Sequence, residues 1–111
     1  MQAYRQEQAS MGSTTITHHV VGQGGKYIAH LEGETAQGTL EWEPGGERGG
    51  KEIRVATHTI VPNEIGNRGV AAELVERFVA DAREQDFLID PRCSYVDAKF
   101  KRNAEWSDLR A

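Results

Sequence analysis

The chain has 111 residues, 38% of them hydrophobic and 27% charged, which is the size and composition of one globular domain. Its formal net charge of −4 argues against general nucleic-acid binding, and its single cysteine excludes an intrachain disulfide. No apolar run is long enough to span a membrane and the start carries no secretory segment, so we expect a protein of the reducing cytoplasm without a membrane partner.

The N-terminal half of the chain predicts strands. Residues 1–13 are polar and aperiodic, and we interpret them as a flexible extension of a single domain over residues 14–111. Glycine-rich segments at 22–25, 32–34 and 44–50 are typical of turns between strands. The β-type runs between them are Thr14–Val21, Tyr27–Leu31, Gly38–Glu43 and Glu52–Val61. This order predicts an antiparallel β-meander.

The alternation of the fourth run divides its residues between the two faces of the sheet. One face is predicted to carry Ile53, Val55, Thr57, Thr59 and Val61. His58 would then share the other face with Ala56 and Ile60. On the third run, Leu40 and Trp42 lie on one face, and we expect Trp42 to pack in the core.

The C-terminal half predicts helices packed on that sheet. Apolar residues at helical spacing give an amphipathic helix over Val70–Gln85, which must bury its stripe against the sheet. Phe87–Ile89 is a short strand candidate, and a strand–helix–strand unit sets its two strands parallel. Ser94 would cap a second helix over Ser94–Arg102, and Trp106 would pack back on the domain. The fold class is therefore α/β.

A glycine-bearing turn lies between the fourth strand and the first helix. It contains Gly66 and Gly69, after the strand ends at Val61-Pro62. The first N–H groups of a helix have no partner inside it, and the helix dipole adds positive potential there. Such a place suits a phosphate group. The alternative is a tight strand-to-helix turn that binds no ligand. No metal-ligand spacing is present, because adjacent His18 and His19 would point to opposite faces of a strand.

Several motifs in this order resemble the small, minimal members of the GNAT superfamily of acyl-CoA-dependent N-acetyltransferases. The resemblance covers about Tyr27 to Leu109. It rests on the order of its pieces: His58-Thr59-Ile60-Val61-Pro62, Gly66-Asn67-Arg68-Gly69-Val70-Ala71, Pro91-Arg92-Cys93-Ser94-Tyr95-Val96 and Asn103-Ala104-Glu105-Trp106. The family turn usually reads Arg-Gly-x-Gly. Here the basic residue, Arg68, stands two places later and Asn67 occupies the place of the first glycine, a residue that tolerates left-handed backbone conformations.

The resemblance implies that the cosubstrate is acetyl-CoA and that no metal takes part. Its diphosphate would lie on the turn, and its pantetheine arm would pair like an added strand with the end of the preceding strand. The implied CoA-binding residues are Thr59, Ile60, Val61, Gly66, Asn67, Arg68, Gly69, Val70 and Ala71. The partners are then a CoA thioester and an amine acceptor, either a protein or a small molecule. A chain this short lacks the helices that shape the acceptor pocket in larger members, so the acceptor side is expected to be open.

Two side chains are candidates for the proton and acyl chemistry. His58 could act as a general base, because imidazole exchanges protons near neutral pH, or it could be a half-buried strand residue. Cys93 could carry the acyl group or protonate the leaving thiolate, or it could be a small buried apolar residue. The alternative function is a non-catalytic acyl-CoA or nucleotide-binding module, or a protein-interaction module, on the same fold.

Overall fold

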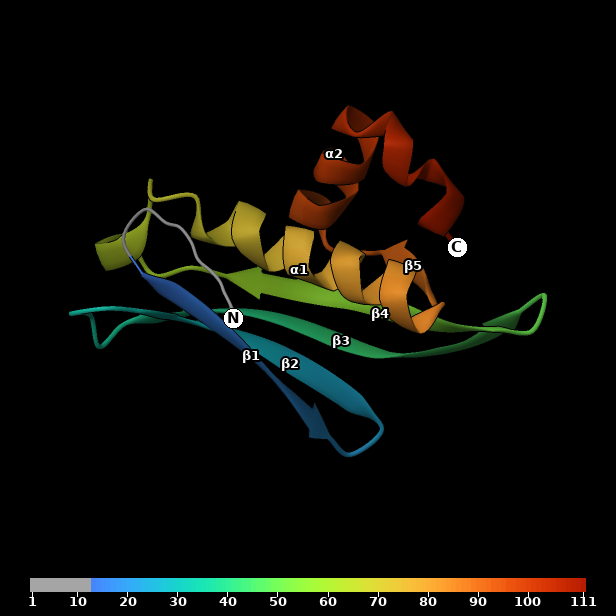
Figure 1. The fold of residues 1–111 in the computed structure, drawn as a ribbon, viewed down its shortest axis with the longest axis horizontal. Helices are drawn as coiled ribbons and strands as arrows, with labels where there is room; N and C mark the ends of the chain where they lie inside the picture. Colours follow the sequence, from blue (N-terminus) through green and yellow to red (C-terminus); the bar gives the residue numbers. More distant parts are fainter. Residues whose placement is uncertain (1–12) are drawn as a thin grey trace.

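The computed structural model describes residues 13–111, so the predicted extension lies outside the described residues except for Ser13. Five strands form one mixed sheet in the order β1-β2-β3-β4-β5 (Figure 1). They are β1 (Thr14–Val21), β2 (Gly24–Leu31), β3 (Gln37–Arg48), β4 (Lys51–Ile60) and β5 (Leu88–Pro91). The first four pair antiparallel, and β5 pairs parallel to β4. The predicted α/β meander with one added parallel strand is confirmed.

Two of the hairpin turns are shorter than the glycine-rich segments suggested. Gly22 and Gln23 alone join β1 to β2, so β2 begins three residues before the predicted Tyr27. Gly49 and Gly50 alone join β3 to β4, with φ of 60° and 84°. Two successive positive φ values match the twist of an antiparallel hairpin, and glycine adopts them without strain.

The third strand runs through a segment that was predicted as a turn. It does not stop at Glu43, because Pro44, Glu47 and Arg48 also pair with β4. An irregularity between Pro44 and Glu47 takes up one extra residue. A Cβ at Gly45 would lie only 2.7 Å from the Val55 side chain, so the glycine here lets side chain and backbone approach closely.

A β-bulge interrupts the predicted alternation of β4. Trp42 pairs with Ala56 and Glu41 with His58, which leaves Thr57 as an extra residue. Ala56 is fully buried in the core, whereas the His58 side chain is exposed beside Glu41. The prediction that His58 and Ala56 share a face is therefore wrong. The predicted single face of Ile53, Val55, Thr57, Thr59 and Val61 is interrupted at the same place.

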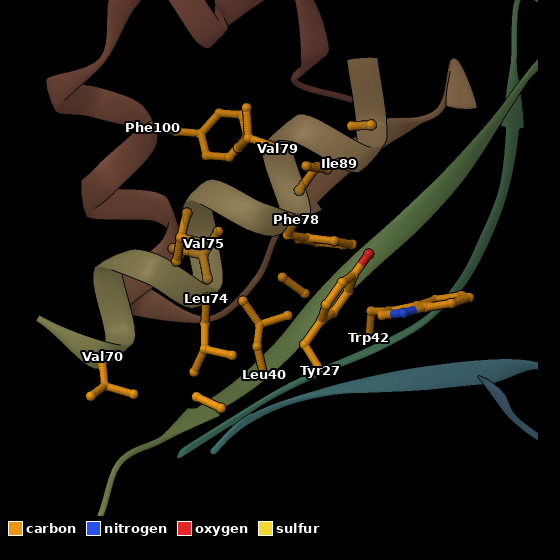
Figure 2. Close-up of a cluster of buried hydrophobic side chains, with 14 of the residues drawn as sticks. Tyr27, Leu40, Trp42, Val70, Leu74, Val75, Phe78, Val79, Ile89 and Phe100 are labelled. Carbon is orange, nitrogen blue, oxygen red and sulfur yellow. The ribbon is translucent and has the colours of Figure 1, made fainter. Parts of the chain in front are cut away.

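The main helix α1 (Val70–Gln85) begins and ends where the apolar periodicity predicted. Figure 2 shows its Leu74 and Phe78 directed toward Leu40 and Tyr27 on the sheet. Trp42 also lies in this core and is 4% exposed, as expected from the sequence. Figure 1 shows α1, α2 and the C-terminal 3-10 helix on the same side of the sheet, so no described element covers the other face. We call that uncovered side the open face.

The last elements differ slightly from prediction. β5 starts at Leu88 rather than Phe87, which instead packs fully buried against the core. α2 (Ser94–Arg102) has the predicted bounds, but Cys93 is its N-cap and Ser94 is its first helical residue. The prediction that Ser94 caps this helix is wrong, because Ser94 is already its first helical residue. The reason is that Cys93 holds the extended backbone conformation that precedes the helix.

The C-terminus returns to the sheet through η3 (Ala104–Leu109). Trp106 packs against the Phe100 ring at 5.5 Å between centroids, which confirms that it folds back on the domain. The Ala111 N–H donates to the Ile89 carbonyl at 2.8 Å, and Arg110 forms a parallel bridge with Ile89. The outer edge of β5 is therefore covered by the chain end.

The C-terminal half of α1 carries a buried polar cluster. Asp81 is 7% exposed and accepts a 2.6 Å hydrogen bond from the Tyr27 hydroxyl. Arg77 Nε donates to Asp81 at 3.2 Å, and its Nη1 donates to the Ile16 carbonyl at 3.1 Å. The carboxylate therefore has both a neutral and a charged partner, which burial of an acid requires.

Candidate functional site

The turn between β4 and α1 holds an unusual backbone. After Pro62, the one-turn helix η2 (Asn63–Ile65) inserts Ile65, which is fully buried and anchors the turn. Asn67 and Gly69 then adopt left-handed conformations, with φ of 64° and 75°. Asparagine is one of the few non-glycine residues that adopt this region, so Asn67 replaces the expected glycine without preventing closure of the turn.

The N-terminus of α1 is bare. Gly69 is the N-cap and supplies no side chain, so within the described part of the chain the N-cap leaves the first-turn N–H groups without a side-chain acceptor. A pocket of about 240 Å³ lies in front of them. It is lined by Val61, Ile65, Gly66, Asn67, Gly69, Val70, Ala71, Ala72 and Tyr95. Mostly small side chains, free amides and the positive end of a helix dipole together suit an anionic group such as a diphosphate.

A glycine in the sheet fixes the position of this pocket. A Cβ on Gly38 of β3 would lie 2.8 Å from a methyl group of Val70 and 3.4 Å from a methyl group of Val61. The start of α1 therefore approaches the sheet as closely as the backbone permits. Val70 is 2% exposed, so the first residue of the helix is held firmly against the core.

Six of the nine residues that the resemblance implied for CoA binding line this pocket. Arg68 does not, because its side chain turns to Glu34, with 3.1 Å between Nη2 and Oε2. Thr59 and Ile60 lie upstream on β4, and the Ile60 side chain is exposed. Tyr95 is a lining residue that sequence reasoning missed as a site residue, although it lies within the Pro-x-Cys-Ser-Tyr-Val motif.

The parallel strands separate immediately upstream of the pocket. Pairing of β4 with β5 ends at Ala56 and Pro91, and a last hydrogen bond of 2.9 Å joins the Cys93 N–H to the Ala56 carbonyl. Within residues 13–111, no strand pairs with residues 57–60 of β4 on that side. An extended ligand could therefore add along this edge in the manner of a strand.

Cys93 lies at this separation, on the helix side of the sheet. Its Sγ donates to Thr59 Oγ1 at 3.5 Å. Partial burial acts to raise the pKa of the Cys93 thiol, but hydrogen bonds that the Thr59 hydroxyl and backbone N–H groups in the first turn of α2 donate to the thiolate form outweigh it. The net result is a pKa below the usual thiol value, which increases the fraction of reactive thiolate.

His58 lies on the open face. Its Nδ1 is 3.7 Å from Glu41 Oε1, a partner on the adjacent strand that the sequence alone did not identify. Thr59 pairs with core-facing Leu40, so it points to the helix side together with Cys93. The two candidate catalytic side chains therefore flank β4 from opposite faces and do not form one dyad.

A second hollow lies beside the His58 partner. It has a volume of about 280 Å³ and includes Glu41 and the bulge residue Thr57. Its full lining is Val21, Gly24, Gly25, Lys26, Glu41, Trp42, Glu43 and Thr57. Gly24 contributes no side chain to the floor. The hollow thus places carboxylates beside the point where β4 and β5 separate.

Within residues 13–111, no group of three or more potential ligand side chains is arranged to hold a metal ion. In the same described part of the chain, none of the helices combines the length and the apolar character that crossing a bilayer requires.

Comparison with known proteins places the chain in a family. A search of curated protein sequences finds no match. The family model described as GCN5-related N-acetyl-transferase matches residues 26–109, which include all of the turn, Cys93 and His58. Because the match covers most of the chain and the sheet carries the expected parallel pair, the protein belongs to the GCN5-related N-acetyltransferase family.

Proposed function

We propose that this protein transfers an acetyl group from acetyl-CoA to a primary amine, in the reducing cytoplasm. The observation that carries the proposal is the uncapped start of α1, whose free amides face a pocket beside the separated strands β4 and β5. The amides of residues 67–71 would hold the diphosphate, since the Gly66 N–H already donates to the Asn63 carbonyl at 3.1 Å. The edge formed by Thr59, Ile60 and Val61 would pair with the pantetheine arm, and one of its N–H groups would bind the thioester oxygen.

The two faces of β4 suggest a division of labour. The amine nitrogen attacks the thioester carbonyl carbon, so that a C–N bond forms, the C–S bond breaks and the amine loses a proton. His58, with Glu41 beside it, would accept that proton on the open face. Cys93 on the helix face would protonate the leaving thiolate or carry the acetyl group transiently.

The acceptor would approach from the open face. No described helix covers that face, and the hollow there is lined by the carboxylates of Glu41 and Glu43 and by the single ammonium group of Lys26, so its net negative charge complements an amine acceptor. An exposed lysine of a protein and a small polyamine would both have access to such an open site.

A second candidate is a non-catalytic acyl-CoA-binding module. The separation of His58 and Cys93 on opposite faces favours it, because neither orients the other. Both candidates predict CoA binding, but only the enzyme predicts turnover of acetyl-CoA.

Calorimetry with CoA, followed by an assay of thiol release from acetyl-CoA with a panel of amines, tests both. We expect binding and amine-dependent release of thiol. His58→Ala should slow release and flatten its dependence on pH near neutrality, whereas the control His19→Ala, an exposed residue of β1, should not. Binding without release from any amine would support the module. No binding at millimolar CoA would exclude both candidates.

Mass spectrometry after incubation with acetyl-CoA tests the carrier role of Cys93. A covalent acetyl adduct that disappears in Cys93→Ala would support it. An unchanged adduct in that variant would exclude it.

A further inference from the structure

The basic residue of the turn does not point into the pocket. Its chain neighbours Asn67 and Gly69 both line the pocket, but Arg68 does not. Its guanidinium instead lies 3.1 Å from the Glu34 carboxylate. The side chains are 50% and 29% exposed, so this pair lies at the surface and makes one close nitrogen–oxygen contact.

Glu34 is held in place by the hairpin that carries it. Its N–H donates to the Leu31 carbonyl at 3.1 Å, and the preceding Gly33 has φ of 81°, which closes the turn between β2 and β3. Four residues later, Gly38 contacts the start of α1 through Val70. The hairpin and the α1 turn therefore pack against each other, which brings the Glu34 carboxylate beside Arg68.

The ion pair is well suited to exchange. Exposed pairs of this kind contribute little to stability, so Arg68 can leave Glu34 at small cost. A diphosphate offers a guanidinium several charge-assisted hydrogen bonds. The Glu34 charge would meanwhile repel the same diphosphate across a short distance.

We propose that Glu34 limits the affinity for CoA by holding Arg68 outside the pocket and competing with the ligand diphosphate for it. The inference rests on the proposed function, because it takes CoA as the ligand of the turn. In this view Glu34 is an exchangeable counter-ion that also sets selectivity. Ligands that carry the diphosphate displace it, and ligands without the diphosphate gain nothing from Arg68.

Calorimetry with CoA on four proteins tests this inference: wild type, Glu34→Gln, Arg68→Met and the double variant. We expect Glu34→Gln to tighten CoA binding by about threefold, the scale of an exposed ion pair. The gain should vanish when Arg68 is already replaced by methionine. Pantetheine, which lacks the diphosphate, should bind wild type and Glu34→Gln equally.

Glu64→Gln is the matched control. Glu64 is an exposed carboxylate in the same turn, and within residues 13–111 it forms no ion pair. Its removal changes the local charge equally, so any gain there should be the same in wild type and in the Arg68→Met background. Thermal unfolding of every variant checks that each remains folded.

The results distinguish failure of this inference from failure of the proposed function. Weaker CoA binding by Glu34→Gln would show that Glu34 positions Arg68 for the ligand, and unchanged binding would show that it is inert; either overturns the inference alone. A gain that persists in the double variant would also overturn it. Failure of both wild type and Glu34→Gln to bind CoA would overturn the proposed function and this inference together.

Discussion

The two ends of α1 differ in how their polar groups are hydrogen-bonded. At the N-terminal end, the backbone amides face a pocket, the N-cap Gly69 has no side chain to cap them, and Arg68 of the same turn is paired with Glu34. At the C-terminal end, Asp81 is buried and accepts hydrogen bonds from Tyr27 and Arg77. One end leaves hydrogen-bonding capacity unused, and the other has partners for its buried charge.

The same contrast extends to the residues around Asp81. The His18 ring stacks on Tyr27 at 4.2 Å between centroids, and its Nε2 accepts a 3.0 Å hydrogen bond from Trp42. The Arg54 guanidinium lies 4.2 Å from the Trp42 ring centroid and 4.0 Å from that of Phe87, and these ring faces are its neighbours where its buried Nη1 has no hydrogen-bond partner within residues 13–111. Dense partnership of this kind stabilises the fold, whereas unused backbone donors indicate a place for a ligand. The comparison therefore separates residues that maintain the domain from residues that bind.

We expect the largest effect from a substitution that strains the backbone at the N-terminus of α1. Gly69→Val places a β-branched residue at φ of 75°, which costs about 1–3 kcal/mol or forces the backbone to rotate. Because rotation redirects the first amides of α1, we expect CoA affinity to fall by about a hundredfold, or about 2.8 kcal/mol. Calorimetry measures the affinity.

Gly22→Val is the control for that substitution. Gly22 has φ of 62° in an exposed hairpin turn and no atom near its missing Cβ, so it should lose a similar amount of stability and keep CoA affinity. An equal loss of affinity in both variants would mean that general strain, not the amides at Gly69, controls binding.

The sequence predicted some of this architecture because the signals were local. The bounds of α1 followed from an unbroken apolar stripe preceded by a glycine turn. The left-handed turn at Asn67 was also foreseeable, since its backbone preference is a property of the residue itself. Local preference and final structure agree at these positions.

The features that the sequence did not predict depend on contacts between residues that are distant along the chain. The bulge at Thr57 exists only in the register between β3 and β4, and no residue of β4 signals it. It moved His58 to the face opposite Ala56 and next to Glu41. The pair of Arg68 with Glu34 likewise requires the hairpin to lie beside the turn, which sequence spacing does not reveal.

The next largest effect is expected on the free energy of unfolding, from a substitution at the C-terminal end of α1. Tyr27→Phe removes the hydroxyl that donates to Asp81, and loss of one partner of a buried carboxylate should lower the free energy of unfolding by about 2 kcal/mol. Urea unfolding measures it. The folded variant should bind CoA as wild type does, because the change lies away from the bare end.

Tyr95→Phe serves as the comparison for Tyr27→Phe. Tyr95 is 36% exposed, so removal of its hydroxyl should change stability by less than about 0.5 kcal/mol. If Tyr27→Phe lost no more stability than Tyr95→Phe, the hydrogen bonds from Arg77 alone would be enough for Asp81. The Tyr27 hydroxyl would then contribute little to the free energy of unfolding.

A smaller effect should appear in the pH dependence of stability. Burial, followed by the nearby Arg54 charge, lowers the pKa of His18 from its ordinary value of 6.5. The unfolded chain then binds a proton more readily than the folded one, so stability should decrease as the pH falls below 6.5, until the folded imidazole is also protonated. His18→Gln should reduce this slope, because an amide can accept from Trp42 without titrating.

Urea unfolding between pH values of about 7.5 and 5, which bracket the ordinary histidine pKa, gives that slope, and His19→Gln is its control. His19 lies exposed on the same strand, so its replacement should leave the slope as in wild type. A slope that is the same in all three proteins would assign the loss of stability to groups other than His18.

The smallest expected effect is on the reactivity of the Cys93 thiol. Thr59→Val removes a hydrogen bond that lowers the pKa of the Cys93 thiol, so less thiolate should be present at neutral pH. Alkylation at neutral pH should then slow by about threefold, the scale of one net hydrogen bond. Thr57→Val is matched, because that hydroxyl donates to the Glu41 carbonyl on the neighbouring strand. Equal slowing in both variants would indicate a change in access to the gap between β4 and β5, whereas slowing in Thr59→Val alone would identify a thiol tuned by its strand neighbour.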